Sequence, residues 1–248
     1  MNAKWLACIA GLALLGMSVH ASAAVTMNAT YFTVAESGDP DFNTNPCCSS
    51  YYTNEVLGTL KDGLPVYNSS YGGPTLYDVN SNGELTWWSP SQNSNVTQTG
   101  TGTVTLPYAN YSFFPPNGTG SNDANGFQAA IFRGVLNVPT TESVQFSFGA
   151  DDDAFLALGN TVISQEGGIH GVSAAPVTTS ILSPGNYDLT LFYTDRHESG
   201  AGLYFSLLTQ GVTISGVPEP ATWAMMLFGV GFVGAGLRMR RKEAMIAA

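Results

Sequence analysis

Three consecutive aspartates, Asp151, Asp152 and Asp153, are the side chains whose type and spacing most strongly suggest chemistry in this sequence. They follow one apolar alternating segment and precede another. Adjacent carboxylates repel one another unless a cation neutralises them, and hard oxygen ligands suit calcium. Because Ca²⁺ takes roughly six to eight oxygens, loop carbonyls and other side chains would complete the site. We therefore predict a Ca²⁺ site here; the alternative is a turn in which one aspartate accepts backbone hydrogen bonds and the others face water.

Two other segments, 167–171 and 195–200, combine histidine or acids with glycine. The glycines beside His170 would let the backbone approach a ligand closely. Neither segment has the H-E-x-x-H spacing of a zinc enzyme. The alternative for the second segment is an internal ion-pair network. The residues that we predict to contact a ligand are His170, Asp195, His197 and Glu198.

Strands are the elements predicted to position these groups, because apolar residues alternate with polar ones at a period of two. The alternation is clearest in 144–148, 187–193 and 203–207. Gly159-Asn160 has the composition of a two-residue hairpin turn. Further predicted strands are 25–34, 102–106, 128–136 and 154–163.

Long loops are predicted for residues 37–125, which are rich in Asn, Ser, Gly, Thr and Pro. Trp87 and Trp88 lie in this segment. They would stack on a sugar if exposed, although burial is the commoner fate of such side chains. The expected fold class is all-β, a β-sandwich with long loops that carry the chemistry.

The segments around the aspartates resemble the signature of the fibro-slime domain. Residues 146–153 read F-S-F-G-A-D-D-D, 167–171 read G-G-I-H-G, and 195–200 read D-R-H-E-S-G. The family shows F-x-F-x-x-D-D-D, G-G-V-H-G and E-R-H-x-S-G in this order and at similar spacing. Residues 39–42 and 60–67 are similar to the family's proline-aspartate-phenylalanine and L-x-x-D-G-x-P-V segments. The resemblance spans about residues 25 to 209.

This resemblance implies both a fold and a site. Fibro-slime domains are similar to the β-sandwich of anthrax protective antigen and the yeast flocculins. In the flocculin group an aspartate pair joined by a cis peptide holds calcium that binds sugar hydroxyls, and the pair falls on Asp151 and Asp152. Asp153 would assist, and the loops with the two histidines and Glu198 would line the site. The sequence departs at Gly159-Asn160, where the family has Asp-Gly, and at Asp195, where it has glutamate.

The first 23 residues have the layout of a secretory signal peptide. Lys4 precedes an uncharged apolar stretch, 5–19, and Ala21-Ser22-Ala23 has the small-x-small form that signal peptidase accepts. The stretch is shorter than the roughly 20 residues of a membrane span. We expect export, with cleavage before Ala24.

Residues 214–248 are predicted to be a sorting tail. Pro218, Glu219 and Pro220 precede an uncharged apolar segment, 221–237, and then a cluster of four bases. Such a segment predicts a transmembrane helix with its basic end in the cytoplasm. The order resembles the PEP-CTERM sorting signal of Gram-negative bacteria that make exopolysaccharide, which implies cutting by an exosortase-type membrane protease. The protein would then be released or re-anchored at the cell envelope, outer surface or extracellular matrix; the alternative is a plain membrane anchor.

The segment between the two processed ends is strongly acidic. Residues 24–217 hold three of the chain's 8 bases and sixteen of its 18 acids. This balance disfavours nucleic acid and anionic lipid and suits divalent cations or neutral ligands, although it also serves solubility. Roughly 190 residues are enough for one domain, which we place at 24–213.

Cys47 and Cys48 are the only cysteines expected to remain after export. Adjacent cysteines close only a strained ring, so a vicinal disulfide, a link to another chain and free thiols all stay open. The fold must therefore rest on its core.

These features predict an exported, non-catalytic domain that binds glycan with the help of calcium and is associated with exopolysaccharide or biofilm. One alternative is a structural matrix protein in which calcium only pins loops. Another is a glycoside hydrolase, but such enzymes need two carboxylates about 5 to 9.5 Å apart, which adjacent aspartates do not by themselves create. No G-x-S-x-G nucleophile motif is present.

Overall fold

The computed structural model describes residues 25–35, 39–42, 51–111, 126–197 and 200–217. Their regular structure is entirely β, with eleven strands. None of these residues forms a helix of the length and apolarity needed to cross a bilayer. The predicted signal peptide, Cys47, Cys48 and the tail after Val217 lie outside the described residues.

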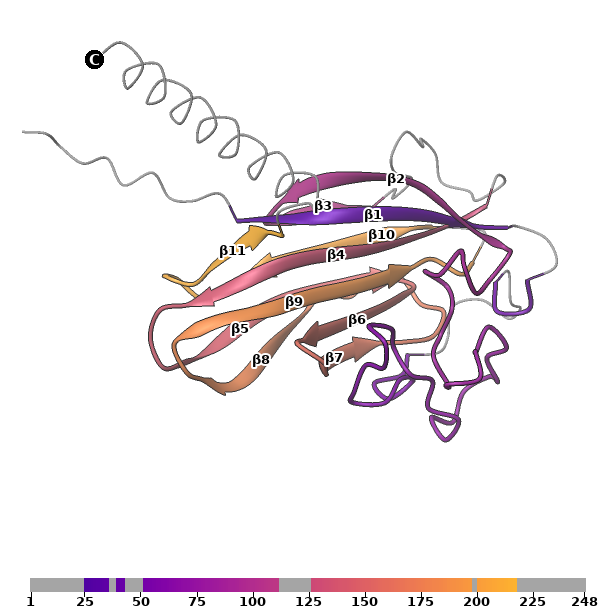
Figure 1. The fold of residues 1–248 in the computed structure, drawn as a ribbon, viewed down its shortest axis with the longest axis horizontal. Helices are drawn as coiled ribbons and strands as arrows, with labels where there is room; N and C mark the ends of the chain where they lie inside the picture. Colours follow the sequence, from indigo (N-terminus) through magenta and orange to yellow (C-terminus); the bar gives the residue numbers. More distant parts are fainter. Residues whose placement is uncertain (1–24, 36–38, 43–50, 112–125, 198–199, 218–248) are drawn as a thin grey trace, which may run out of the picture.

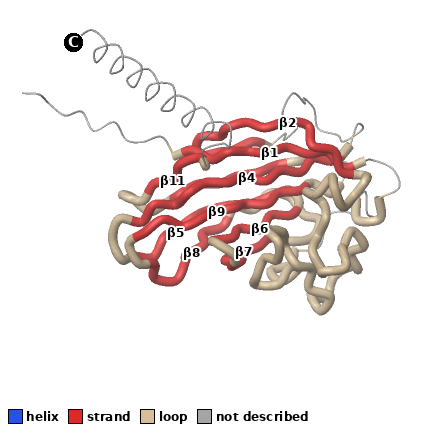
Figure 2. Tube along the Cα trace, viewed as in Figure 1, coloured by secondary structure: helices blue, strands red, loops and turns tan. Residues whose placement is uncertain are grey.

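The strands form two antiparallel sheets that pack face to face, so the predicted all-β sandwich is confirmed (Figures 1 and 2). The larger sheet has the order β2-β1-β4-β9-β6-β7, with β11 also paired to β4. Its strands are β1 (Thr26–Val34), β2 (Val96–Thr105), β4 (Phe127–Val138), β6 (Asp153–Leu158), β7 (Thr161–Glu166), β9 (Gly185–Thr194) and β11 (Thr213–Gly216). The smaller sheet, of order β3-β10-β5-β8, comprises β3 (Tyr108–Asn110), β5 (Glu142–Asp151), β8 (Ala175–Leu182) and β10 (Gly202–Leu207).

The main core lies between the two sheets and is built from the alternating runs seen in the sequence. Val144, Phe146 and Phe148 of β5 point inward and are buried. Leu203 and Phe205 of β10 do the same, and the rings of Phe146 and Phe205 stack 5.8 Å apart. Each buried side chain of this size stabilises the fold by about 1.5–3 kcal/mol.

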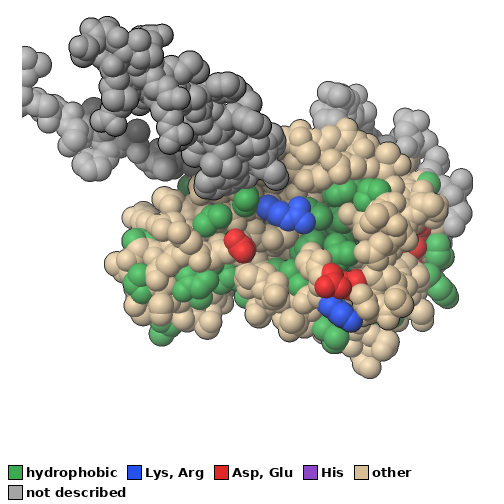
Figure 3. Space-filling model, viewed as in Figure 1, with side chains coloured by type: hydrophobic (Ala, Val, Ile, Leu, Met, Phe, Trp, Pro, Cys, Tyr) green, Lys and Arg blue, Asp and Glu red, His purple; other side chains and the backbone are tan. Residues whose placement is uncertain are grey.

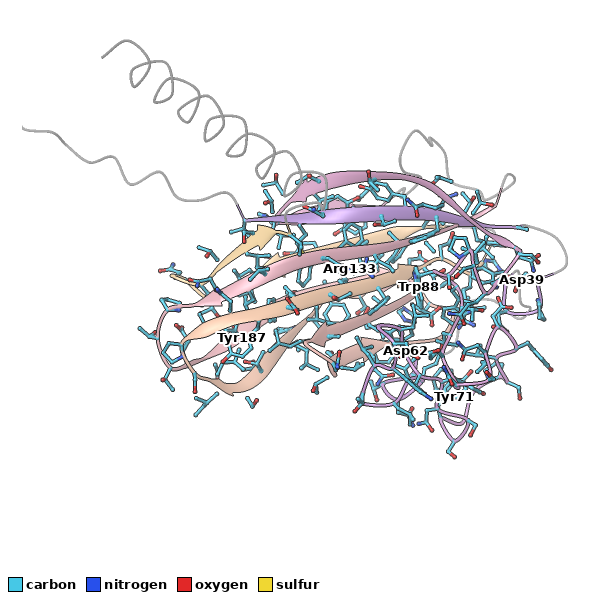
Figure 4. All side chains as sticks on the ribbon, in the orientation of Figure 1. Asp39, Asp62, Tyr71, Trp88, Arg133 and Tyr187 are labelled. Carbon is cyan, nitrogen blue, oxygen red and sulfur yellow. The ribbon has the colours of Figure 1, made fainter. Side chains whose placement is uncertain are left out.

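A second core lies on the outer face of the larger sheet, beneath the long loops. Trp88 contacts Phe155 and Phe192, which belong to β6 and β9. Figure 4 shows Trp88 where the loops meet the sheet. Successive side chains of β1 point to opposite faces of the sheet, so Tyr31 belongs to the first core and Phe32 to the second. The loops are thus packed on the sheet by a core of their own.

Three strands were not predicted, and a fourth is longer than expected. β2 begins at Val96 rather than at 102. Its Thr- and Gly-rich first half lies at the sheet edge with almost no buried side chain, so it lacks the alternating apolar residues from which a strand is predicted. β3 and β11 are only 3 and 4 residues long, and β8 is a largely exposed edge strand. The hairpin turn at Gly159-Asn160 is confirmed, with β6 and β7 on either side.

Both ends of the described domain emerge together. The side-chain amide of Asn28 in β1 donates a hydrogen bond to the carbonyl of Val217, which follows β11 (2.6 Å). The end of β11, Gly216, pairs with Gly134 of β4. Asp195, which follows β9, donates its N–H to the carbonyl of Gln128, six residues earlier in β4. At about 3.3 Å per strand residue, these positions lie roughly 20 Å apart.

Candidate functional site: an aspartate cluster at the sheet junction

The candidate site forms where the chain passes from the smaller sheet to the larger one. Asp151 is the last residue of β5, and Asp153 is the first of β6. The peptide bond between Asp151 and Asp152 is cis. Asp195 directly follows β9, the neighbour of β6, so strand pairing brings it to the same place. The hydroxyl of Tyr193 donates to the Asp151 carbonyl (2.7 Å) and ties β9 to this crossing.

Three carboxylates converge here. One oxygen each from Asp151, Asp152 and Asp195 can be chosen so that all lie within 4.8 Å of one another. Asp152 and Asp195 are buried, whereas Asp151 is half-buried. The cluster is therefore a mostly buried set of oxygens with one member at the surface.

Main-chain donors from two loops hold Asp152 in place. Its Oδ1 accepts from the N–H of His170 (2.9 Å), and its Oδ2 accepts from the N–H of Arg196 (2.8 Å). Burial raises the pKa of Asp152, and the charge of Asp153 raises it further. Asp152 thus joins both predicted loops to the aspartate cluster.

Asp153, predicted as an assisting ligand, points away from the other two and pairs with arginine. Its Oδ2 accepts from Nε of Arg196 (2.5 Å), and its Oδ1 accepts from the N–H of Gly168 (2.7 Å). Arg196 also lies 3.7 Å from Glu55 and 4.9 Å from the centre of the Trp87 ring. Burial alone would lower the pKa of Arg196, but the charges of Asp153 and Glu55 raise it overall.

The predicted ligand-contacting residues occupy different places. Asp195 joins the cluster and accepts from the N–H of His197 (3.2 Å). His170 takes part through its main chain; its ring is buried, lies 3.1 Å from the Gly171 carbonyl and packs edge-on against Tyr51. His197 is half-buried, and Glu198 lies outside the described residues.

The structure answers two questions about the surface that the sequence left open. Trp87 and Trp88 are buried, and their indole N–H groups donate to Asp41 and to the Tyr193 carbonyl, so neither is available to stack on a sugar. Most of the described acids lie inside the protein rather than on its surface. Eight of the thirteen described acids are buried, and the face in Figure 3 carries few charged side chains.

Sequence reasoning missed two residues of this region. Glu55, from the long loops, supplies the second carboxylate for Arg196, and no local pattern distinguishes it. Gly200 has φ of 85°, and a Cβ there would lie 2.8 Å from Asp151 Oδ2. Its place at the end of the D-R-H-E-S-G segment was the available signal.

Comparison with known proteins identifies a motif in the tail. Residues 216–242 match the PEP-CTERM protein-sorting motif. This motif indicates an exported protein that is processed at the membrane by an exosortase and displayed on the cell surface.

The proteins that resemble the domain itself share little sequence identity with it. Protein psiR of Dictyostelium discoideum is 26% identical over 202 residues, which are 70% of this chain and 20% of psiR. The chain thus spans about a fifth of that relative's length. A PA14 sugar-binding domain from an RTX adhesin is similar with a TM-score of 0.36 and 13% identity, over 77% of this chain and 95% of that domain. A subtype-switched Epithelial Adhesin 9 to 1 A domain from Candida glabrata, in complex with β-lactose, is similar with a TM-score of 0.39 and 10% identity. The similarity covers 77% of this chain and 84% of that domain.

Proposed function

We propose that this exported surface protein binds glycans, without catalysis, through a calcium ion held by Asp151, Asp152 and Asp195. The observation that carries the proposal is the convergence of three carboxylate oxygens within 4.8 Å. Like charges this close are unfavourable in a buried setting, and a divalent cation offsets their repulsion.

The donor set fits Ca²⁺ because all three side chains offer hard oxygens. Three carboxylates leave about three to five of the roughly six to eight coordination positions to loop carbonyls, water and a ligand. The half-buried Asp151 marks the side on which sugar hydroxyls would reach the ion. Asp153 is not a ligand in this proposal; it positions Arg196, whose main-chain N–H holds Asp152.

The position of the aspartate cluster suits display at a surface. The tail leaves the domain after Val217, roughly 20 Å along β4 from the level of Asp195. A domain attached through that tail would present the cluster away from its point of attachment. Together with the resemblance to fibro-slime domains and to the sandwich of protective antigen and flocculins, this supports a role in exopolysaccharide or biofilm adhesion.

A glycan array probed with the purified full-length protein, with and without a chelator, tests the proposal. We expect chelator to abolish binding, and Asp152→Asn to abolish it in calcium. Binding that survives both treatments would contradict the calcium mechanism.

The structural alternative has one observation in its favour, since Asp152 already joins the loops of His170 and Arg196. An ion there would pin both loops. If calcium raises the melting temperature of the protein but the protein binds no glycan on the array, this alternative is favoured.

A further inference from the structure

A separate cleft opens between β7 and β8, the edge strands of the larger and smaller sheets. These strands lie on the same side of the sandwich (Figures 1 and 2). The cleft has a volume of about 400 Å³, within the range of roughly 300–1,000 Å³ that is typical of small-ligand sites. Its lining includes Tyr51, Phe148, Ile163, Gln165, Glu166 and Pro176.

Glu166 gives this cleft an unneutralised acid. The residue is 2% exposed, and its Oε2 accepts from the N–H of Ala150 (2.8 Å). Its Oε1 has no donor among the described residues, and the buried Arg196 is bonded to Asp153 and lies 3.7 Å from Glu55. Burial raises the pKa of Glu166 to about 7. Buried carboxylates are normally paired with a cation, so this one lacks its usual complement.

Tyr51 supplies an aromatic wall beside that acid. Its side chain is 50% exposed, and its ring packs edge-on against His170 at 5.1 Å. Both side chains line the cleft. Burial raises the pKa of Tyr51, and the negative charge of Glu166 raises it further. An aromatic face next to a carboxylate is a favourable environment for an organic cation.

We propose that this cleft binds the ammonium group of an amino sugar within a polysaccharide. Glu166 pairs with the ammonium, the ring of Tyr51 covers a face of the sugar, and Ser164 lines the cleft where a sugar hydroxyl would lie. A hydroxyl alone would leave the carboxylate charge uncompensated. The choice of a saccharide as the carrier rests on the proposed function, but the cleft itself contains none of the three clustered aspartates.

The test compares two probes that differ in charge. Binding of a glucosamine trimer and of its N-acetylated counterpart to the full-length protein is measured by calorimetry at neutral pH, in chelator. We expect the amino form to bind at least about tenfold more tightly, a difference of roughly 1.4 kcal/mol. Glu166→Gln, which keeps an acceptor for Ala150, should remove this preference, and Tyr51→Ala should weaken both trimers.

One control variant and the chelator separate the role of Glu166 from a general effect of removing an acid and from calcium binding. Glu142→Gln removes a partly exposed acid from the far end of β5 and should leave the preference intact. Because binding is measured in chelator, failure of the calcium proposal would not affect this result. Equal affinity for the two trimers, or a preference that survives Glu166→Gln, would overturn the assignment.

Discussion

Asp152 and Asp153 are neighbours in the chain, yet the fold gives them opposite surroundings. Asp153 meets a buried arginine and the N–H of Gly168, so its charge is neutralised inside the protein. Asp152 receives only main-chain donors and faces two other carboxylates. The difference shows that identical adjacent acids become a structural ion pair or a candidate ligand site according to the counter-charge that the fold provides.

The largest loss in the free energy of unfolding is expected from removing Arg196, the counter-charge of Asp153. Arg196→Met leaves Asp153 and Glu55 buried without a cation, and breaking such a pair costs about 3–5 kcal/mol. Chemical denaturation monitored by tryptophan fluorescence measures the loss. Arg133→Met, at an exposed arginine, should change the free energy of unfolding by less than about 0.5 kcal/mol. Similar losses in both variants would contradict the assigned roles.

The second prediction separates the two aspartates directly. With calcium at about 100 times its dissociation constant, the wild-type protein should gain about 2.7 kcal/mol. Asp152→Asn should show no gain, because it removes a ligand charge. Asp153→Asn should start from a lower stability and still respond to calcium, as thermal unfolding with and without chelator would show. Equal loss of the response in both variants would remove the distinction between them.

The sequence predicted the sandwich because its core strands alternate cleanly, as in 144–148. It could not separate the three aspartates, since their surroundings depend on Arg196 and Glu55, which are distant in sequence. Glu55 comes from a loop with no periodic pattern, and it meets Arg196 only after the second core packs that loop on the sheet. Asp195 was predicted as a glycan contact, but strand pairing places it with Asp151 and Asp152.

A smaller loss of stability and of calcium affinity is expected from a substitution at Gly200, which lies against Asp151. Gly200→Ala places a Cβ 2.8 Å from Asp151 Oδ2 and also strains a backbone with φ of 85°. We expect a loss of about 1–2 kcal/mol from the strain and a roughly tenfold weaker calcium affinity. Gly159→Ala is a matched control, because its φ is 57° and nothing lies within 4 Å of the added Cβ. The control should lose stability alone; unchanged calcium affinity in Gly200→Ala would argue against Asp151 as a ligand.

A pH-dependent effect on stability is expected at Asp78, a partly buried acid in the long loops with neither arginine nor a proposed cation. Burial raises the pKa of Asp78 to about 7, and the charges of Asp39 and Asp41 contribute. An acid whose pKa is raised by folding destabilises the protein as pH rises from about 4 through 7. Asp78→Asn should therefore raise the melting temperature at pH 8 more than at pH 4. Exposed Asp188→Asn should show no such difference, and equal shifts at both pH values for Asp78→Asn would contradict this account.

Anomalous diffraction from crystals grown in calcium tests the central claim most directly. We expect a calcium peak about 2.3–2.6 Å from carboxylate oxygens of Asp151, Asp152 and Asp195, with Asp153 still bonded to Arg196. A well-diffracting crystal at saturating calcium with no peak among these three aspartates would contradict it.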